Sequence, residues 1–253
     1  MTGAESTSRA ALANQLLQLT QSQLEWVQGV IDQFQLPYEF RRLATSDIIS
    51  EQVLERVGDA LRIHHAFSRQ ALSKDRFEFA FERALTLSNI DAFMPESRTN
   101  RGHDLTVAGV PISLKTEAAN AIRRDQIHIS KWMELGRGEW ALPLLLDLFL
   151  EHMDGYERIF TLRRLTPGPD EYEYELVEIP KSLMLEAEEC ELVVQEASKQ
   201  NPKPGYGHVW ADDGTLKYSL YFDGGAERKL QIKALRKDLC IVHANWSFAS
   251  TAL

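Results

Sequence analysis

Hydrophobic residues recur every three or four positions along the first third of the chain, and this spacing predicts amphipathic helices. The pattern occupies residues 10–34, with a break near its middle, then 46–62 and 77–87. Ser73 precedes the last of these segments, and serine is favoured at a helix N-cap. A loop is expected at residues 35–39. The first third of the chain is therefore predicted to be mainly helical.

From residue 104 onward, alternating and short apolar runs predict strands instead. A strongly apolar helix is expected over residues 139–153 and a short acidic helix over 182–189, while 199–207 has the composition of an extended loop. The expected strands are residues 157–165, 172–179, 218–222, 229–232 and 240–248, with a hairpin turn at 223–226.

These elements predict a mixed α/β (α+β) fold in a single domain over residues 1–253. We find no internal repeat and no linker that would divide the chain, and 44% hydrophobic residues are enough for a substantial core. The expected regions are N-terminal helices (1–65), a central core (66–165) and a β-rich C-terminal extension (166–253). Because no apolar window approaches a membrane span and the N-terminus lacks a signal pattern, a cytoplasmic protein is expected.

Residues 104–117 form the most informative segment, because they read as a β-hairpin with one chemically useful face. With the turn at residues 108–109, Leu105 pairs with Ile112 across the ladder. Side chains alternate between the two faces of a strand, so the apolar residues share one face and the polar residues share the other. The polar face carries Asp104, Ser113, Lys115 and Glu117.

An aspartate beside a strand that carries a lysine can hold Mg²⁺ on a phosphate while the amine activates water. Such pairs are also common on ordinary solvent-facing strands, so this interpretation needs a further acid. Glu78 and Glu82 lie one helical turn apart within the aromatic-rich run 77–82. We expect Glu82 to be a solvated helix residue and Glu78 to be the better candidate. Glu117 and Glu134 remain alternatives.

The net charge of −9 argues against a protein that coats nucleic acid non-specifically, since phosphate binding favours a basic surface. It does not exclude an enzyme acting on DNA, because acids at a metal site can coexist with a locally basic cleft. The positive residues do cluster, at 98 and 101, 123 and 124, 199 and 203, and 228, 229 and 233.

Glu78 on a helix, Asp104 at the start of a strand and Lys115 on the next strand together resemble the PD-(D/E)xK nuclease superfamily, which includes many type II restriction endonucleases. The chain departs from that pattern at two places. Gly102-His103 stands where the proline would be, and Ser113 stands where an acid usually lies two positions before the catalytic lysine. Some members also carry serine there and recruit an acid from elsewhere.

A closer likeness, over roughly residues 60–248, is to type II restriction endonucleases that cut in the middle of CCCGGG. It implies Mg²⁺-dependent cleavage of double-stranded DNA by a homodimer, with a cognate DNA methyltransferase in the same restriction-modification system. Residues 66–165 would form the catalytic core and 166–253 the recognition and dimer region. The runs that carry the likeness are 96–100, 114–119, 130–136, 156–163 and 222–229.

The resemblance also implies roles for individual residues. Asp104, Glu78 and Glu117 would bind the metal ion, and Lys115 would act on the attacking water together with Asp104 and Glu78. A G·C-rich site favours arginine or lysine on guanine. The DNA-binding candidates are Arg98, Arg101, Arg228 and Lys229, followed by Asn201 and Lys203. The alternatives are a MutH-like nicking or repair nuclease and a catalytically inactive DNA-binding protein on a nuclease fold.

Overall fold

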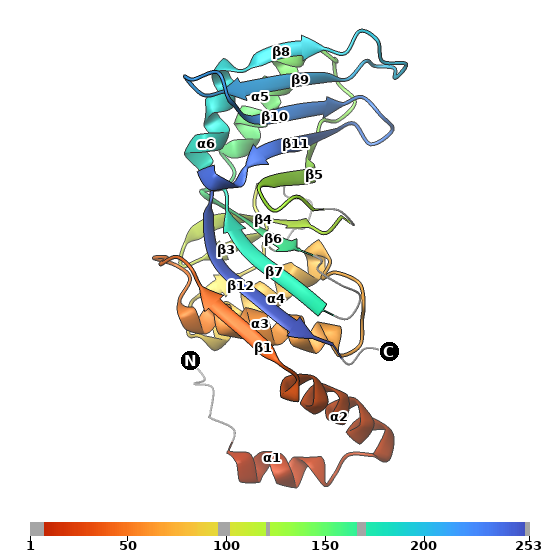
Figure 1. Ribbon diagram of the computed structural model, residues 1–253, viewed down its shortest axis with the longest axis vertical. Helices are drawn as coiled ribbons and strands as arrows, with labels where there is room; N and C mark the ends of the chain where they lie inside the picture. The colour runs from red at the N-terminus through yellow and green to blue at the C-terminus, as the bar shows by residue number, and fades with distance from the viewer. Residues whose placement is uncertain (1–7, 96–101, 120–121, 166–170, 251–253) are drawn as a thin grey trace.

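The structure is a computed structural model that describes residues 8–95, 102–119, 122–165 and 171–250. It is elongated, with two β-sheets arranged one after the other along the long axis and a pair of N-terminal helices at one end (Figure 1). This arrangement confirms the predicted mixed α/β fold. No helix within the described ranges combines the length and the apolar composition needed to cross a membrane.

The predicted helices are confirmed, with corrected boundaries. The helix expected over residues 139–153 begins at Leu142, and the helix expected over 182–189 is α-helical only as far as Leu185. The helix expected from residue 46 begins only after Ser50, whose hydroxyl accepts a hydrogen bond from the Val53 amide. Ser46 instead caps a short turn by accepting hydrogen bonds from the amides of Ile48 and Ile49. The helices are α1 (Arg9–Leu16), α2 (Gln21–Gln35), α3 (Glu51–His65), α4 (Lys74–Leu87), α5 (Leu142–Met153) and α6 (Lys181–Leu185), with 3-10 turns at Glu186–Glu189 and Lys237–Leu239.

The larger sheet has seven strands in the order β1-β12-β7-β6-β4-β3-β2. All its neighbours are antiparallel except β4 and β6, which run parallel because β5 and α5 form the connection between them. The sheet thus contains strands from all three expected regions of the chain. Its strands are β1 (Tyr38–Arg42), β2 (Ala92–Phe93), β3 (Leu105–Val107), β4 (Val110–Glu117), β6 (Arg158–Arg164), β7 (Glu171–Glu178) and β12 (Ile241–Ala249).

The loop predicted over residues 35–39 is wrong at its end, because β1 begins at Tyr38. Tyr38 and Phe40 pack against the core, and β1 pairs along its whole length with β12, more than two hundred residues later. Long-range pairing therefore overrides the local turn signal of Pro37. Helices α3 and α4 cover this sheet with an apolar layer that includes Phe77, Phe81 and Leu114.

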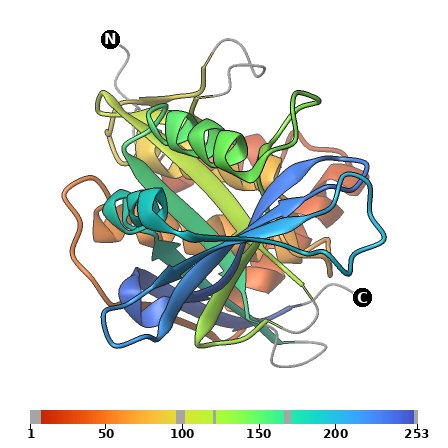
Figure 2. The same ribbon diagram turned by 90° about the horizontal axis from the view of Figure 1, so that it is seen from above.

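The smaller sheet has the order β5-β11-β10-β9-β8 and shares a second core with α5, which packs beside it (Figure 2). The predicted β10–β11 hairpin is confirmed, whereas β5, β8 and β9 had no strand prediction. The loop expected over residues 199–207 is wrong at its end, because β9 begins at Gly205 and pairs with both β8 and β10. Two register shifts interrupt the pairing of β5 with β11, which matches the broken alternation of its sequence. The strands are β5 (Gln126–Glu134), β8 (Glu191–Val194), β9 (Gly205–Trp210), β10 (Leu216–Asp223) and β11 (Lys229–Arg236).

Candidate active site

The hairpin of β3 and β4 has the predicted register, with Leu105 opposite Ile112 and no bulge at the turn. Ala108 and Gly109 both have positive φ, 48° and 82°, which is typical of the two-residue turns that suit strand twist. Asp104 extends the hairpin, because its amide donates to the Ile112 carbonyl over 2.9 Å.

Two hydrogen bonds from β4 fix the Asp104 carboxylate. Its Oδ2 atom accepts from the Leu114 amide at 2.7 Å and from the Ser113 hydroxyl at 3.2 Å. The serine that replaces the expected acid is therefore a donor that orients the neighbouring acid. The other oxygen, Oδ1, instead contacts the Lys74 ammonium, so the two oxygens of Asp104 have different partners.

Lys115 lies on the same face of β4 as Ser113, and its side chain is only 6% exposed. Its Nζ atom lies 5.5 Å from the centre of the Trp132 ring. Burial lowers the pKa of Lys115 to about 8, although the nearby Asp104 carboxylate opposes the shift. A substantial fraction of the amine is thus neutral at mildly alkaline pH and able to accept a proton.

Glu78 lies in the first turns of α4 and is linked to the hairpin by Lys74, which pairs with both Glu78 and Asp104. The Lys74 Nζ atom lies 2.6 Å from Glu78 Oε1 and 2.6 Å from Asp104 Oδ1. Burial acts to raise the pKa of Asp104, but the ammonium groups of Lys115 and Lys74 and the Leu114 amide outweigh it and hold that pKa below its ordinary value. The structure therefore brings Glu78, Asp104 and Lys115 together.

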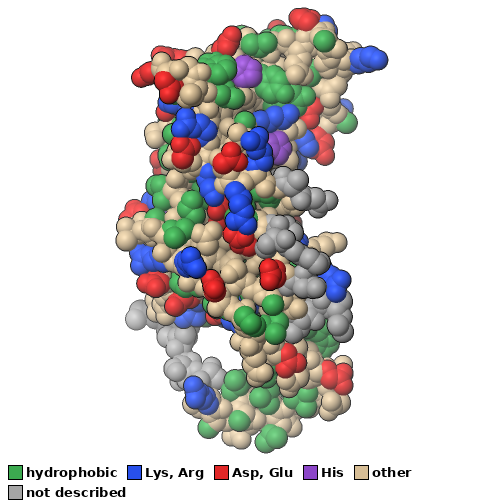
Figure 3. Space-filling model, viewed as in Figure 1, with side chains coloured by type: hydrophobic (Ala, Val, Ile, Leu, Met, Phe, Trp, Pro, Cys, Tyr) green, Lys and Arg blue, Asp and Glu red, His purple; other side chains and the backbone are tan. Residues whose placement is uncertain are grey.

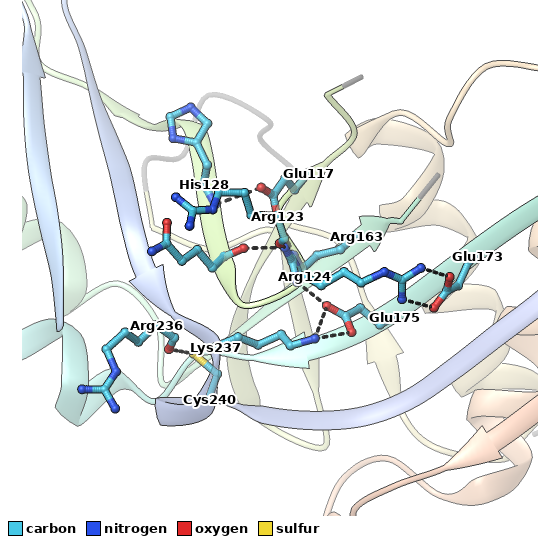
Figure 4. A network of polar contacts seen from close by, with 11 residues as sticks. Glu117, Arg123, Arg124, His128, Arg163, Glu173, Glu175, Arg236, Lys237 and Cys240 are labelled. Atoms are coloured by element: carbon cyan, nitrogen blue, oxygen red, sulfur yellow. Dashed lines mark hydrogen bonds and ion pairs between the residues drawn. The ribbon is translucent and has the colours of Figure 1, made fainter. Parts of the chain in front are cut away.

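Glu117 belongs to a different cluster, shown in Figure 4. Its Oε2 atom accepts from Arg163 and its Oε1 atom accepts from the His128 amide at 3.0 Å. Arg163 is completely buried and also binds Glu175, which in turn pairs with Lys237 at 3.0 Å. Burial raises the pKa of Glu117, with Arg163 opposing the shift. Both oxygens of Glu117 are thus engaged in a network that joins β4, β6 and β7.

Glu134, the other alternative acid, lies in a solvent-exposed ion pair with Lys131 at 2.7 Å. Glu82 is half-buried on α4. Among the residues that the structure describes, no cluster of three or more His, Cys, Asp or Glu side chains could hold a metal ion. Of the three acids expected to bind a metal ion, Glu78 and Asp104 are the two that contact one shared cation, the Lys74 ammonium.

This pair fits Mg²⁺ by the chemistry of its donors. Mg²⁺ binds carboxylate oxygens and commonly takes only one or two from the protein, with water and substrate phosphate completing the shell. The space between Glu78 and Asp104 already receives a positive group, the Lys74 ammonium, in contact with one oxygen of each acid. Both side chains are about one-fifth exposed, so the pair can be reached from solvent.

The family model of SmaI, described as a type II site-specific deoxyribonuclease, matches residues 12–248 of the chain. The chain belongs to this family. It is 53% identical over 204 residues to the type II restriction enzyme SmaI of Serratia marcescens, an alignment that covers 81% of this chain and 83% of the relative. No solved structure matches it. The predicted resemblance to type II restriction endonucleases is confirmed, and the chain is a type II site-specific deoxyribonuclease.

Among the residues expected to contact DNA in this SmaI-family chain, Asn201 and Arg228 lie together. Both line an open polar hollow of about 320 Å³, along with Arg137 and Gln200. Gly224 allows the two loops that line the hollow to approach each other closely, because a Cβ there would lie 2.1 Å from the Pro202 carbonyl oxygen. Arg98 and Arg101 lie outside the described residues.

Lys203 and Lys229 are held by nearby acids. Lys203 binds the carboxylate and the carbonyl of Glu196, and Lys229 pairs with Glu227 at 2.8 Å. Figure 3 shows the same intermixing across one whole face, where lysine and arginine gather around the junction of the two sheets beside acidic side chains. Positive charge alone therefore does not mark the DNA-contacting surface of this protein.

Several residues of the site were not among the predicted ones. Lys74 was detectable in principle, since it precedes Glu78 by one helical turn. Arg137 stands between two glycines in a turn, and Gly136 has a φ of 69°. Trp132 is on β5, a strand without a clear local signal, so its contact with Lys115 required the tertiary structure.

Proposed function

We propose that this enzyme cuts both strands of a short GC-rich palindrome, CCCGGG, in a Mg²⁺-dependent reaction. The observation that supports the catalytic part best is the buried Lys115 amine beside the Asp104 and Glu78 carboxylates. The cut sequence rests on the likeness to endonucleases with that specificity. A palindromic target suits a two-fold homodimer in which each subunit cuts one strand.

In this proposal Asp104 and Glu78 hold the metal ion, with Ser113 and the Leu114 amide fixing the orientation of Asp104. When bound, Mg²⁺ would neutralise charge on the scissile phosphate and on the leaving 3′ oxygen. Lys115 accepts a proton from the attacking water, which requires its neutral form. Trp132 and the surrounding core keep bulk water away from the amine and so maintain its lowered pKa.

Base recognition is proposed for the hollow that Arg137, Asn201 and Arg228 line. A guanidinium group can donate two hydrogen bonds to guanine O6 and N7, and amide side chains also read base edges. Arg228 packs 5.5 Å from the centre of the Trp140 ring, which limits its motion. The cognate DNA methyltransferase would protect the same sequence in the host and needs no stable complex with this chain.

The decisive experiment incubates the purified protein with a plasmid that carries one CCCGGG site, in Mg²⁺ or in EDTA, beside the Lys115→Ala variant. We expect discrete double-strand ends at that site, lost with EDTA and with the substitution. Nicks in one strand only would favour the nickase alternative. Binding without any cleavage in Mg²⁺ or Mn²⁺ would contradict the catalytic assignment of Lys115.

A further inference from the structure

We propose that the Lys74 ammonium is a built-in counter-ion of the acid pair, and that a divalent cation binds Asp104 and Glu78 by displacing it. This inference rests on the proposed function, in which those two acids hold the metal. The Nζ atom contacts one oxygen of each acid at 2.6 Å, which is the position a shared cation would take. Lys74 therefore competes with the metal for the same oxygens.

The placement of Lys74 is not explained by helix stability. It is the first residue of α4, directly after the N-cap Ser73, where the helix dipole disfavours positive charge. A lysine four positions before a glutamate is also the weaker orientation of such a pair on a helix. The favourable partners of this ammonium are the two acids of the site, and Asp104 comes from a segment thirty residues away.

The local charges explain why such a counter-ion is useful. Two carboxylates that share a partly buried site repel each other until a cation lies between them. Lys74 supplies that cation in the metal-free protein, so Glu78 and Asp104 face each other before the metal ion arrives. Its side chain is 39% exposed, so it can swing toward solvent without disrupting the core. The cost is a weaker apparent affinity for the metal.

The test measures Mn²⁺ binding by calorimetry to the full-length protein without DNA, in the wild type and in Lys74→Met and Lys74→Arg. We expect Lys74→Met to tighten the dissociation constant by about tenfold or more, because a positive charge in contact with the ligands is removed. Lys74→Arg keeps the charge and should bind Mn²⁺ about as weakly as the wild type.

Lys217→Met is the matched control, since it removes a lysine from another ion pair, with Glu186, and changes the net charge equally. Its Mn²⁺ affinity should equal that of the wild type. An unchanged, weaker or still undetectable affinity in Lys74→Met would overturn the displacement. Equal tightening in Lys74→Met and Lys217→Met would also overturn it, because net charge would then be the cause.

A second readout follows Lys74 directly. In the wild type, saturating Mn²⁺ should increase acylation of Lys74 by acetic anhydride, measured on peptides by mass spectrometry, while Lys217 stays constant. Unchanged or decreased acylation of Lys74 would contradict its release. Asp104→Asn distinguishes a failure of the metal site from a failure of displacement. Normal Mn²⁺ binding by this variant would refute the metal site itself. If the variant loses Mn²⁺ binding, the metal site stands, and the Lys74 variants then test displacement alone.

Discussion

Lys115 lies beside carboxylates but is buried against Trp132, and the burial controls its acid–base chemistry. An exposed lysine would stay protonated far above neutral pH. In this structure desolvation lowers the pKa of the amine to about 8 despite Asp104. The residue is thus suited to accept a proton under mildly alkaline conditions.

This shift predicts the pH dependence of cleavage. The neutral amine is the active form, so the single-turnover rate should rise from pH 6, reach half of its maximum near pH 8 and level off at higher pH. A metal ion beside the amine would move the midpoint lower, never higher. Quenched-flow measurements with saturating enzyme test this.

Lys115→Arg is the matched control for the pH profile, because guanidinium keeps the charge but does not deprotonate in this range. We expect its rate to fall by roughly 10²–10⁴-fold with the fold retained. A rate that is flat with pH in the wild type, or near-normal cleavage by Lys115→Arg, would show that Lys115 is not the proton acceptor.

At this scale the sequence predicted the cluster of Asp104, Lys115 and Glu78, because strand alternation and helical spacing are local rules. The sequence could not predict the ion-pair partner of the Glu117 carboxylate. The partner of Glu117 is Arg163, 46 residues later, and that pairing depends on β4 and β6 lying side by side.

Among the elements, β4, β6 and β7 are joined by the network of Glu117, Arg163, Glu175 and Lys237 as well as by backbone hydrogen bonds (Figure 4). Such a network contributes little when complete, but it is costly to break from one side, because the remaining charges stay buried. The network therefore ties β4, the strand that carries Lys115, to β6 and β7 through side chains as well as through the backbone.

Arg163→Met should lower the free energy of unfolding by about 3–5 kcal/mol, because two buried carboxylates lose their shared partner. Urea denaturation followed by circular dichroism measures the change. Arg124→Met, which removes an exposed pair with Glu173, is the control and should cost about 1 kcal/mol or less.

Glu117→Gln extends the same argument to catalysis. Since both oxygens of Glu117 are engaged by the network, this variant should keep cleaving DNA at a temperature where it is folded, while Asp104→Asn should not. If Glu117→Gln were as inactive as Asp104→Asn, Glu117 would have to be reassigned as a metal ligand.

The elements that the sequence did not reveal share one property. β1, β5, β8 and β9 have short or irregular hydrophobic patterns of their own, and β1 and β5 also pair with strands distant along the chain. The helices α2, α3 and α4 carry their own caps at Thr20, Ser50 and Ser73, so they were predictable from local sequence.

Considering the whole molecule, the proposed function places DNA cleavage and base recognition on different sheets. Lys115 lies on the seven-stranded sheet, and the hollow with Arg137 and Arg228 lies at loops of the five-stranded sheet. Composition and element order predicted the fold class. They could not divide the strands between two sheets, because β12 returns to the first sheet after β8 to β11 have built the second.

This division predicts separable defects. Arg137→Ala should weaken binding to a CCCGGG duplex by about 10- to 100-fold in EDTA, the loss expected for one bidentate contact with a base, while binding to a scrambled duplex changes little. Fluorescence anisotropy measures both affinities. Arg41→Ala, an exposed arginine of β1 paired with Glu39, is the control. An equal loss on both duplexes would assign Arg137 to the phosphate backbone instead.

The pairing of β12 with both β1 and β7 has a consequence for the synthesis of this enzyme. A chain emerging from the ribosome displays β1, the acids and Lys115 long before β12, which occupies the gap between the first strand and the rest of the sheet. The sheet that carries Lys115 can therefore close only after translation has passed β12.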